Sequence, residues 1–179
     1  AVPRIAVSRS RPPAFVEVHR LAPFGFRAVD TGVVMDLMIH DLDLLLRVMG
    51  EEPERVDAVG VPVVSRHEDI ANVRLTWAGG TVANVTASRA SLRTERRMRV
   101  FQDNSYTSID FLNKKLRIVR RVPGATMNGM PALEIEETLV ESDFVATRWE
   151  RDPASPAQSS YERKYRAQGR RLFGARFVK

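Results

Sequence analysis

Cysteine is absent from this chain of 179 residues, and histidine occurs only three times. Without thiols the chain can form neither a disulfide nor a thiolate metal site. Three histidines alone do not suggest a closed zinc site, so we expect no bound metal. Apolar residues nevertheless make up 44% of the chain. This is an ordinary value for a globular protein, so wholesale disorder is not expected.

Long apolar runs are also absent. No stretch approaches the roughly 20 apolar residues of a membrane helix, and residues 1–13 lack the apolar core of a signal peptide. We therefore expect a cytoplasmic protein with no membrane contact.

No Gly-x-Gly-x-x-Gly motif, which binds dinucleotides in Rossmann domains, occurs in the chain. The nearest pattern, residues 124–129, is interpreted as a glycine-bearing loop. We expect no Rossmann domain and no cofactor-binding residue in this chain.

The net charge of +6 is concentrated at one end of the chain. Residues 1–150 carry 20 basic and 20 acidic side chains, whereas residues 151–179 carry eight basic and two acidic ones. We expect a flexible leader over residues 1–13, one domain over 14–150 and a disordered basic tail over 151–179. The tail interleaves aromatic residues with arginine, so weak nucleic-acid binding through the tail is kept as an alternative function.

Within residues 14–150 the pattern predicts one strong helix and a series of strands. The helix spans residues 33–49, with Thr31 as its N-cap and Gly50 just beyond its last turn. Alternating apolar residues and turn signals predict strands at 14–21, 56–64, 70–77, 81–88, 98–102, 106–111, 116–122 and 133–140. This order favours an α+β domain with helices on one face of an antiparallel sheet.

The predicted helix is apolar nearly all the way round, which is typical of a buried helix. Its polar residues Asp36, His40, Asp43 and Arg47 fall within about 60° of one another at the α-helical period. Among the polar residues of the predicted helix, only Asp41 lies outside this range. The helix is therefore expected to carry one narrow polar stripe.

Asp36 and His40 are i,i+4 neighbours in this stripe. A carboxylate beside an imidazole favours its protonated form and fixes its orientation, and such a histidine can exchange a proton with a substrate hydroxyl. We regard His40 and Asp36 as candidate catalytic residues. The alternative is that both are structural, and that Asp43 and Arg47 form only an ion pair.

Arginine and histidine side chains near strand ends are further candidates. His19 and Arg20 end the first predicted strand and Arg89 follows a later one, so each could contact a sugar or a phosphate, as could Asp43. The run Arg93, Arg96, Arg97 and Arg99, with Glu95, could be a phosphate site or a solvated charged face.

Two segments carry a family resemblance. Residues 30–50 read DTGVVMDLMIHDLDLLLRVMG and residues 15–24 read FVEVHRLAPF. They resemble the start of the C-terminal domain in the glucose–fructose oxidoreductase and inositol dehydrogenase family (Gfo/Idh/MocA), most closely members that act on nucleotide-linked amino sugars. The resemblance extends over about residues 14–140. It implies a large, open, mostly antiparallel sheet whose outer face builds a homo-oligomer.

The resemblance also implies roles for two residues. The histidine that matches His40 lies beside the nicotinamide and the reacting sugar carbon and acts in acid–base catalysis, and the aspartate that matches Asp36 orients it. A separate Rossmann domain binds NAD or NADP and supplies a lysine from a Glu-Lys-Pro motif, which this chain lacks. A truncated gene, a proteolytic fragment and a shifted reading frame would each account for this.

We therefore expect the substrate-binding and catalytic domain of an NAD(P)-dependent sugar or nucleotide-sugar oxidoreductase, inactive without a nucleotide-binding domain. The alternative is a non-catalytic oligomerisation or scaffold module. Self-association through the open sheet face is expected because the strands hold more apolar residues than one core face requires. These residues are Val73, Leu75, Trp77, Val82, Val85, Ile109, Phe111, Ile118, Ile135 and Leu139.

Overall fold

The computed structural model of the chain describes residues 12–25 and 30–139. The expected leader as far as residue 11, the domain beyond residue 139 and the basic tail lie outside the described residues. No helix in the described ranges is long and apolar enough to cross a membrane. The strands are β1 (Phe15–Leu21), β2 (Arg55–Val61), β3 (Ile70–Thr76), β4 (Val82–Ser88), β5 (Glu95–Gln102), β6 (Ser105–Asp110), β7 (Lys115–Met127) and β8 (Met130–Leu139).

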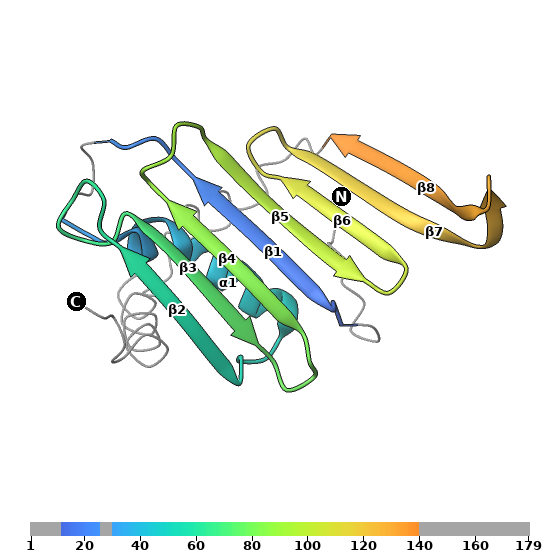
Figure 1. Cartoon of the computed structure of the whole chain (residues 1–179), viewed down its shortest axis with the longest axis horizontal. Helices are drawn as coiled ribbons and strands as arrows, with labels where there is room; N and C mark the ends of the chain where they lie inside the picture. The colour runs from blue at the N-terminus through green and yellow to red at the C-terminus, as the bar shows by residue number, and fades with distance from the viewer. Residues whose placement is uncertain (1–11, 26–29, 140–179) are drawn as a thin grey trace, which may run out of the picture.

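The strands form one open sheet in the order β2-β3-β4-β1-β5-β6-β7-β8 (Figure 1). All neighbouring strands are antiparallel except β1 and β4, which are parallel. After β1 and the helix, the chain adds β2, β3 and β4 on one side of β1, then crosses to the other side and adds β5 to β8. The expected α+β fold is confirmed.

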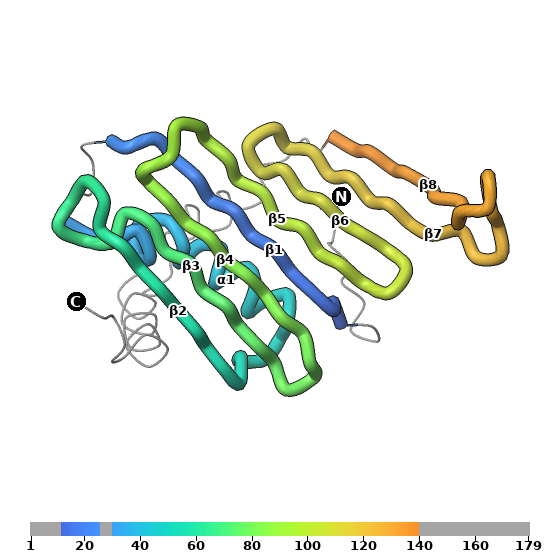
Figure 2. The backbone as a smooth tube through the Cα atoms, viewed as in Figure 1, coloured from blue at the N-terminus to red at the C-terminus, as the bar shows by residue number. Residues whose placement is uncertain are grey.

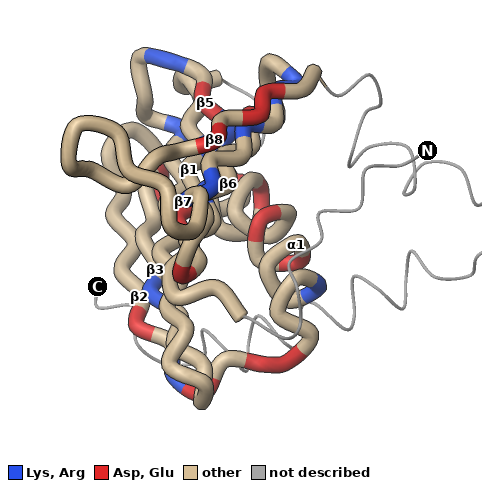
Figure 3. The backbone as a smooth tube through the Cα atoms, turned by 90° about the vertical axis from the view of Figure 1, so that its right-hand side faces the viewer, with Lys and Arg blue, Asp and Glu red and all other residues tan. Residues whose placement is uncertain are grey.

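Side-chain alternation gives the sheet two different faces. One face packs against the helix (Figure 3), and we call the opposite one the open face. The helix side holds the fully buried core, which comprises Val16, Val18, Val73, Leu75, Ala83, Val85, Ala87, Met98 and Val100 from the strands and Val34, Met38 and Leu45 from the helix. In Figure 1 the helix lies behind the left half of the sheet.

The helix is not the single α-helix that the sequence pattern predicts. It begins as a π-helical turn, η1 (Val34–Met38), and continues as α1 (Ile39–Met49). The expected N-cap at Thr31 is wrong, because the residue before η1 is Val33 and no side chain caps this end. Gly50 does end α1, with a left-handed backbone at φ 72°, a conformation that glycine adopts without steric cost.

The expectation that this helix is buried on all sides is also wrong. Among the described residues, the buried positions Val34, Met38, Asp41 and Leu45 share the side that faces the sheet, as their spacing requires. His40 is partly exposed, whereas Asp41, which lies outside the predicted polar stripe, points into the core.

The glycine-bearing loop expected at residues 124–129 is confined to Asn128 and Gly129. β7 continues as far as Met127, with a register irregularity between Arg121 and Thr126. The turn to β8 is formed by Asn128 and Gly129, whose φ angles are 53° and 76°. Positive φ at both positions is the pattern of a tight hairpin turn, for which Asn-Gly is a strong signal. Figure 2 shows this hairpin end far from α1.

Candidate active site

His40 lies in the first turn of α1, immediately after the π-helical turn that carries Asp36. The turn is π-helical because the backbone N–H of Ile39 bonds the carbonyl of Val34, five residues earlier. Single π turns occur frequently at functional sites. The wider turn changes the angle between Asp36 and His40, so the simple i,i+4 geometry predicted from sequence does not apply to this pair.

An ion pair joins the first strand to the helix beside His40. The Arg20 guanidinium donates from Nε and Nη2 to the two carboxylate oxygens of Asp41, at 2.6 and 2.8 Å. The two side chains are only 13% and 4% exposed. A bidentate pair of this kind fixes both planes, so it holds the first turn of α1, and with it His40, against the end of β1.

Burial, together with nearby arginines, lowers the pKa of the His40 imidazole below the ordinary histidine value. Burial contributes most, and Arg20 is the next cause, with Arg96 adding to the effect. Asp41 and Asp36 act in the opposite direction, and Asp36 has the weakest influence. The expectation that Asp36 keeps His40 protonated is therefore wrong. The imidazole is neutral at neutral pH, which is the form that accepts a proton.

A buried network fixes the start of the helix. Arg89 donates from Nε to Asp69 at 2.8 Å, from Nη1 to the Thr31 carbonyl at 2.6 Å and from Nη2 to the Ser65 hydroxyl at 2.9 Å. Its side chain is 4% exposed. The structure therefore does not support the predicted substrate contact of Arg89, because the guanidinium is enclosed and serves to anchor the segment that precedes η1.

The carboxylate of Asp69 is the centre of this network. It accepts backbone N–H groups from Val63, Val64 and Ser65 at 2.6–2.8 Å, in addition to Arg89. Burial alone would raise the pKa of Asp69, but these donors together hold it far below the ordinary value. Next to Asp69 in the chain, Glu68 accepts the N–H of Val33 through its carbonyl. The loop that contains Asp69 therefore supports the helix directly.

Gly32 lies at this junction. Its carbonyl accepts the N–H groups of Met35 and Asp36 at 3.1 Å. A Cβ on this residue would overlap the carboxylate of Glu68. A larger residue here would therefore require the Glu68 side chain to move away.

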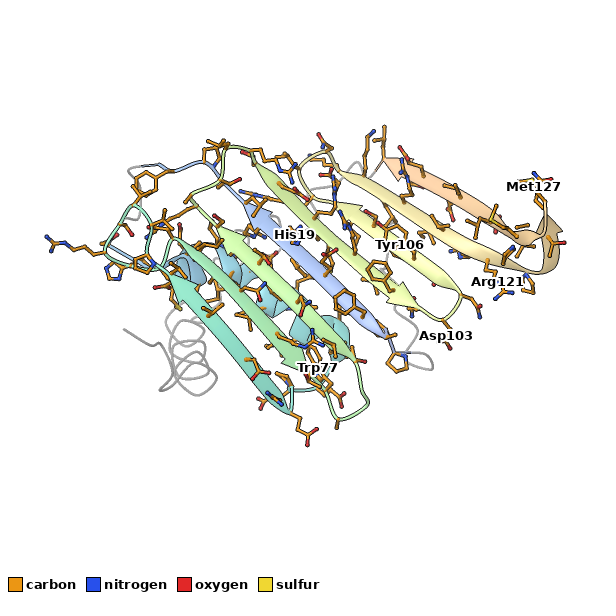
Figure 4. All side chains as sticks on the ribbon, in the orientation of Figure 1. His19, Trp77, Asp103, Tyr106, Arg121 and Met127 are labelled. Carbon is orange, nitrogen blue, oxygen red and sulfur yellow. The ribbon has the colours of Figure 1, made fainter. Side chains whose placement is uncertain are left out.

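His19 lies on the open face of β1 (Figure 4), opposite to the face that carries Arg20 and contacts α1. Its nearest charged neighbours are Glu17 and Glu95, at 3.6 and 3.8 Å. Adjacent residues of a strand point to opposite faces. The structure therefore does not bring His19 and His40 together, and only Arg20 of the two strand-end candidates reaches the helix.

The remaining candidate on the helix, Asp43, accepts a hydrogen bond from Arg47 at 3.0 Å. This is the i,i+4 ion pair that the sequence analysis gave as the alternative to a functional role for Asp43.

Within the described ranges no three His, Asp or Glu side chains are placed to hold a metal ion.

Comparison with known proteins identifies the relatives of this chain. The family model of the GFO/IDH/MocA C-terminal domain matches residues 4–105. UDP-N-acetylglucosamine 3-dehydrogenase from Acidithiobacillus ferrooxidans is 46% identical over 139 residues, which are 77% of this chain and 44% of that protein. The chain belongs to the Gfo/Idh/MocA family. It matches the C-terminal domain of that family and spans less than half the length of this relative.

Solved structures agree with this assignment. The UDP-N-acetylglucosamine 3-dehydrogenase of Acidithiobacillus ferrooxidans superposes with a TM-score of 0.66 at 46% identity, covering 75% of this chain and 43% of that one. Levoglucosan dehydrogenase in complex with NADH and levoglucosan gives a TM-score of 0.55 at 13% identity, covering 69% and 39%. The second likeness supports the family fold only.

Sequence reasoning missed the two residues that position the site, Asp41 and Asp69. In the sequence, Asp41 was distinguished only by its position outside the polar stripe of the helix. That position was the signal that could have identified it. A lone aspartate on the apolar side of a helix needs a buried cationic partner. Asp69 gave no such signal, because its partners are backbone N–H groups and a residue 20 positions away.

Proposed function

We propose that this chain is the substrate-binding and catalytic half of an NAD-dependent nucleotide-sugar dehydrogenase. The observation that carries the proposal is the exposed, neutral imidazole of His40, held by the Arg20–Asp41 pair at the end of β1. The likeness to a UDP-N-acetylglucosamine 3-dehydrogenase at 46% identity supports the substrate class. UDP-N-acetylglucosamine is the substrate that we propose to test first.

In this proposal His40 acts as the general base. Oxidation of a sugar hydroxyl removes the hydrogen on carbon as a hydride and the hydroxyl hydrogen as a proton, leaving a ketone. A ring nitrogen of His40 takes the proton, which requires the neutral imidazole that burial and the Arg20 charge favour. The roles of Asp36 are to orient the substrate or His40 and to offset part of the positive charge of Arg20 and Arg96.

The described residues do not form a site that fits a dinucleotide. The described ranges contain no strand–glycine loop–helix unit of the kind that binds a pyrophosphate at a helix N-terminus. A nicotinamide held by a separate nucleotide-binding domain would accept the hydride. We accordingly assign only substrate binding and proton transfer to this chain.

A chimaera tests this function. This chain is joined to the N-terminal part of the UDP-N-acetylglucosamine 3-dehydrogenase of Acidithiobacillus ferrooxidans in place of its own C-terminal domain. NADH absorbance should rise when UDP-N-acetylglucosamine and NAD are added. The 179-residue chain alone should give no NADH and no heat of NADH binding in calorimetry. A folded chimaera that binds NAD but oxidises no nucleotide sugar would contradict the proposal.

Self-association through the open face is a further part of the proposal. Only some of the ten apolar strand residues that were expected to drive self-association lie on the open face. The others are in the core or pack against it, namely Val73, Leu75, Trp77, Val85, Ile109 and Phe111. An apolar row nonetheless crosses the open face. It runs through Val82, Phe15, Phe101, Tyr106, Val119 and Ile135, which are paired in register.

This row suits a second copy of the chain. The rings of Phe15 and Phe101 are 5.8 Å apart and those of Phe101 and Tyr106 are 5.0 Å apart. At the sheet edge Ile135 is 64% exposed and Leu139 is 66% exposed. Three arginines on the open face, Arg97, Arg99 and Arg117, are paired with carboxylates of the same face, Asp110, Glu17 and Glu137.

We expect the chain to form a dimer in light scattering at high micromolar concentration, and Ile135→Glu to shift it to monomer. Leu92→Glu, in the loop between β4 and β5, is the matched control because Leu92 is an exposed apolar residue that lies outside the row. A wild-type chain that is monomeric under these conditions would refute the interface.

A further inference from the structure

Arg96 lies on the same side of the sheet as His40. It sits in β5 directly opposite Arg20 of β1, and directly opposed residues on neighbouring strands project to the same face. Arg20 reaches Asp41, the residue after His40. Arg96 is close enough to His40 to influence its ionisation. Four charged groups from four elements thus surround His40: Arg20, Asp41, Arg96 and Asp36.

Arg96 differs from the other arginines of its segment. Arg93 pairs with Glu95 at 3.1 Å, and Arg97 lies 3.6 Å from both Glu95 and Asp110. Arg99 pairs with Glu17 at 2.8 Å. The hollow of about 320 Å³ beside these residues is lined by Arg93, Arg97 and Arg99, which have carboxylate partners, and also by Arg96. This argues against Arg93, Arg97 and Arg99 as an anion site, but not against Arg96.

The Arg96 side chain is exposed and makes no hydrogen bond or ion pair with any residue in the part of the chain that the structure describes. Its neighbour Arg20 is a second cation, and like charges directly opposite each other destabilise a sheet. Asp41 neutralises Arg20 and occupies its Nε and Nη2. The positive charge left without a partner beside His40 is therefore that of Arg96.

The geometry points to Arg96 as the residue that binds the diphosphate of the nucleotide-sugar substrate and so places the sugar ring against His40. This inference rests on the proposed function. A guanidinium can bind two phosphate oxygens at once, which fixes orientation as well as position. The sugar ring links the diphosphate to the reacting hydroxyl, so the two must be held on one side of the sheet, as Arg96 and His40 are.

The first test needs no cofactor and uses the 179-residue chain. The imidazole signals of His40 are followed by NMR while inorganic pyrophosphate is added. Pyrophosphate bound at Arg96 should shift these signals and raise the pKa of His40, and Arg96→Ala should abolish the response. Arg97→Ala is the matched control, because Arg97 is the next residue in β5 and faces the open side. An equal response in the Arg96→Ala chain would overturn the inference.

The second test uses the chimaera and separates the possible sources of the diphosphate. Arg96→Ala should raise KM for UDP-N-acetylglucosamine by about 10- to 100-fold, the loss expected for one charged hydrogen-bonded contact, and leave kcat largely unchanged. Arg96→Lys should restore part of the loss, and Arg97→Ala should have no effect. A rise in KM for NAD instead of the sugar would assign Arg96 to the cofactor and refute the substrate role. An inactive wild-type chimaera would count against the proposed function, while the pyrophosphate titration would still decide the role of Arg96.

Discussion

His40→Ala in the chimaera is expected to lower turnover by about 10²–10⁴-fold, the range typical for loss of a general acid or base. The side chain is partly exposed and is not part of the buried hydrophobic core. Its removal should therefore leave the melting temperature nearly unchanged. Turnover is measured from NADH absorbance and melting from circular dichroism on the same preparations.

His67→Ala is the control for this substitution. His67 is also exposed, but it lies in the loop between β2 and β3, and its replacement should change neither turnover nor melting. If His40→Ala melts early yet turns over normally per folded molecule, the imidazole is structural and the catalytic assignment is wrong.

Asp69→Asn is expected to lower the free energy of unfolding by about 3–5 kcal/mol, the usual cost of breaking a buried ion pair by removing one charge. The Asp69 side chain is fully buried and its partner Arg89 is 4% exposed. The substitution leaves the Arg89 charge without its counterion and weakens the acceptor of three backbone N–H groups. Urea unfolding of the two chains measures the difference.

The pH dependence of this difference is a second readout. The pKa of Asp69 is lower in the folded chain than in the unfolded one, so its contribution is fully present above the unfolded value of roughly 4 and declines as pH falls below it. The stability gap between wild type and Asp69→Asn should therefore narrow in acid. Asp57→Asn is the control, because Asp57 pairs with Arg55 on the surface and its loss should hardly change stability. Equal effects of both substitutions would contradict the network.

The sheet could be predicted from the sequence because its strands obey local rules. Two-residue alternation identifies β3 and β4, and the glycines between them identify their hairpin. The same alternation, applied to β1, would have placed His19 and Arg20 on opposite faces. The Asn128–Gly129 turn could also have been predicted from the sequence, because Asn-Gly between alternating apolar residues is a hairpin signal.

The site was less predictable because its geometry depends on contacts between distant segments. No local pattern predicts that the helix begins with a π-helical turn or that the loop before β3 bonds Val33. The Arg20–Asp41 pair joins residues 21 positions apart, so neither residue alone indicates the other. The lowered pKa of His40 also depends on these contacts. The sequence analysis considered Asp36 alone and therefore predicted the opposite direction.

The pH profile of kcat/KM for the chimaera tests the central claim most directly, because it reports the ionisation of the essential base in the free enzyme. Burial, Arg20 and Arg96 lower the pKa of His40, whereas Asp41 and Asp36 raise it less strongly. We predict that activity falls on the acid side with an apparent pKa below that of an ordinary histidine. Asp36→Asn should move this limb to lower pH, and His40→Ala should remove it. An acid limb that persists unchanged in His40→Ala would show that another group is the base, and would contradict the account.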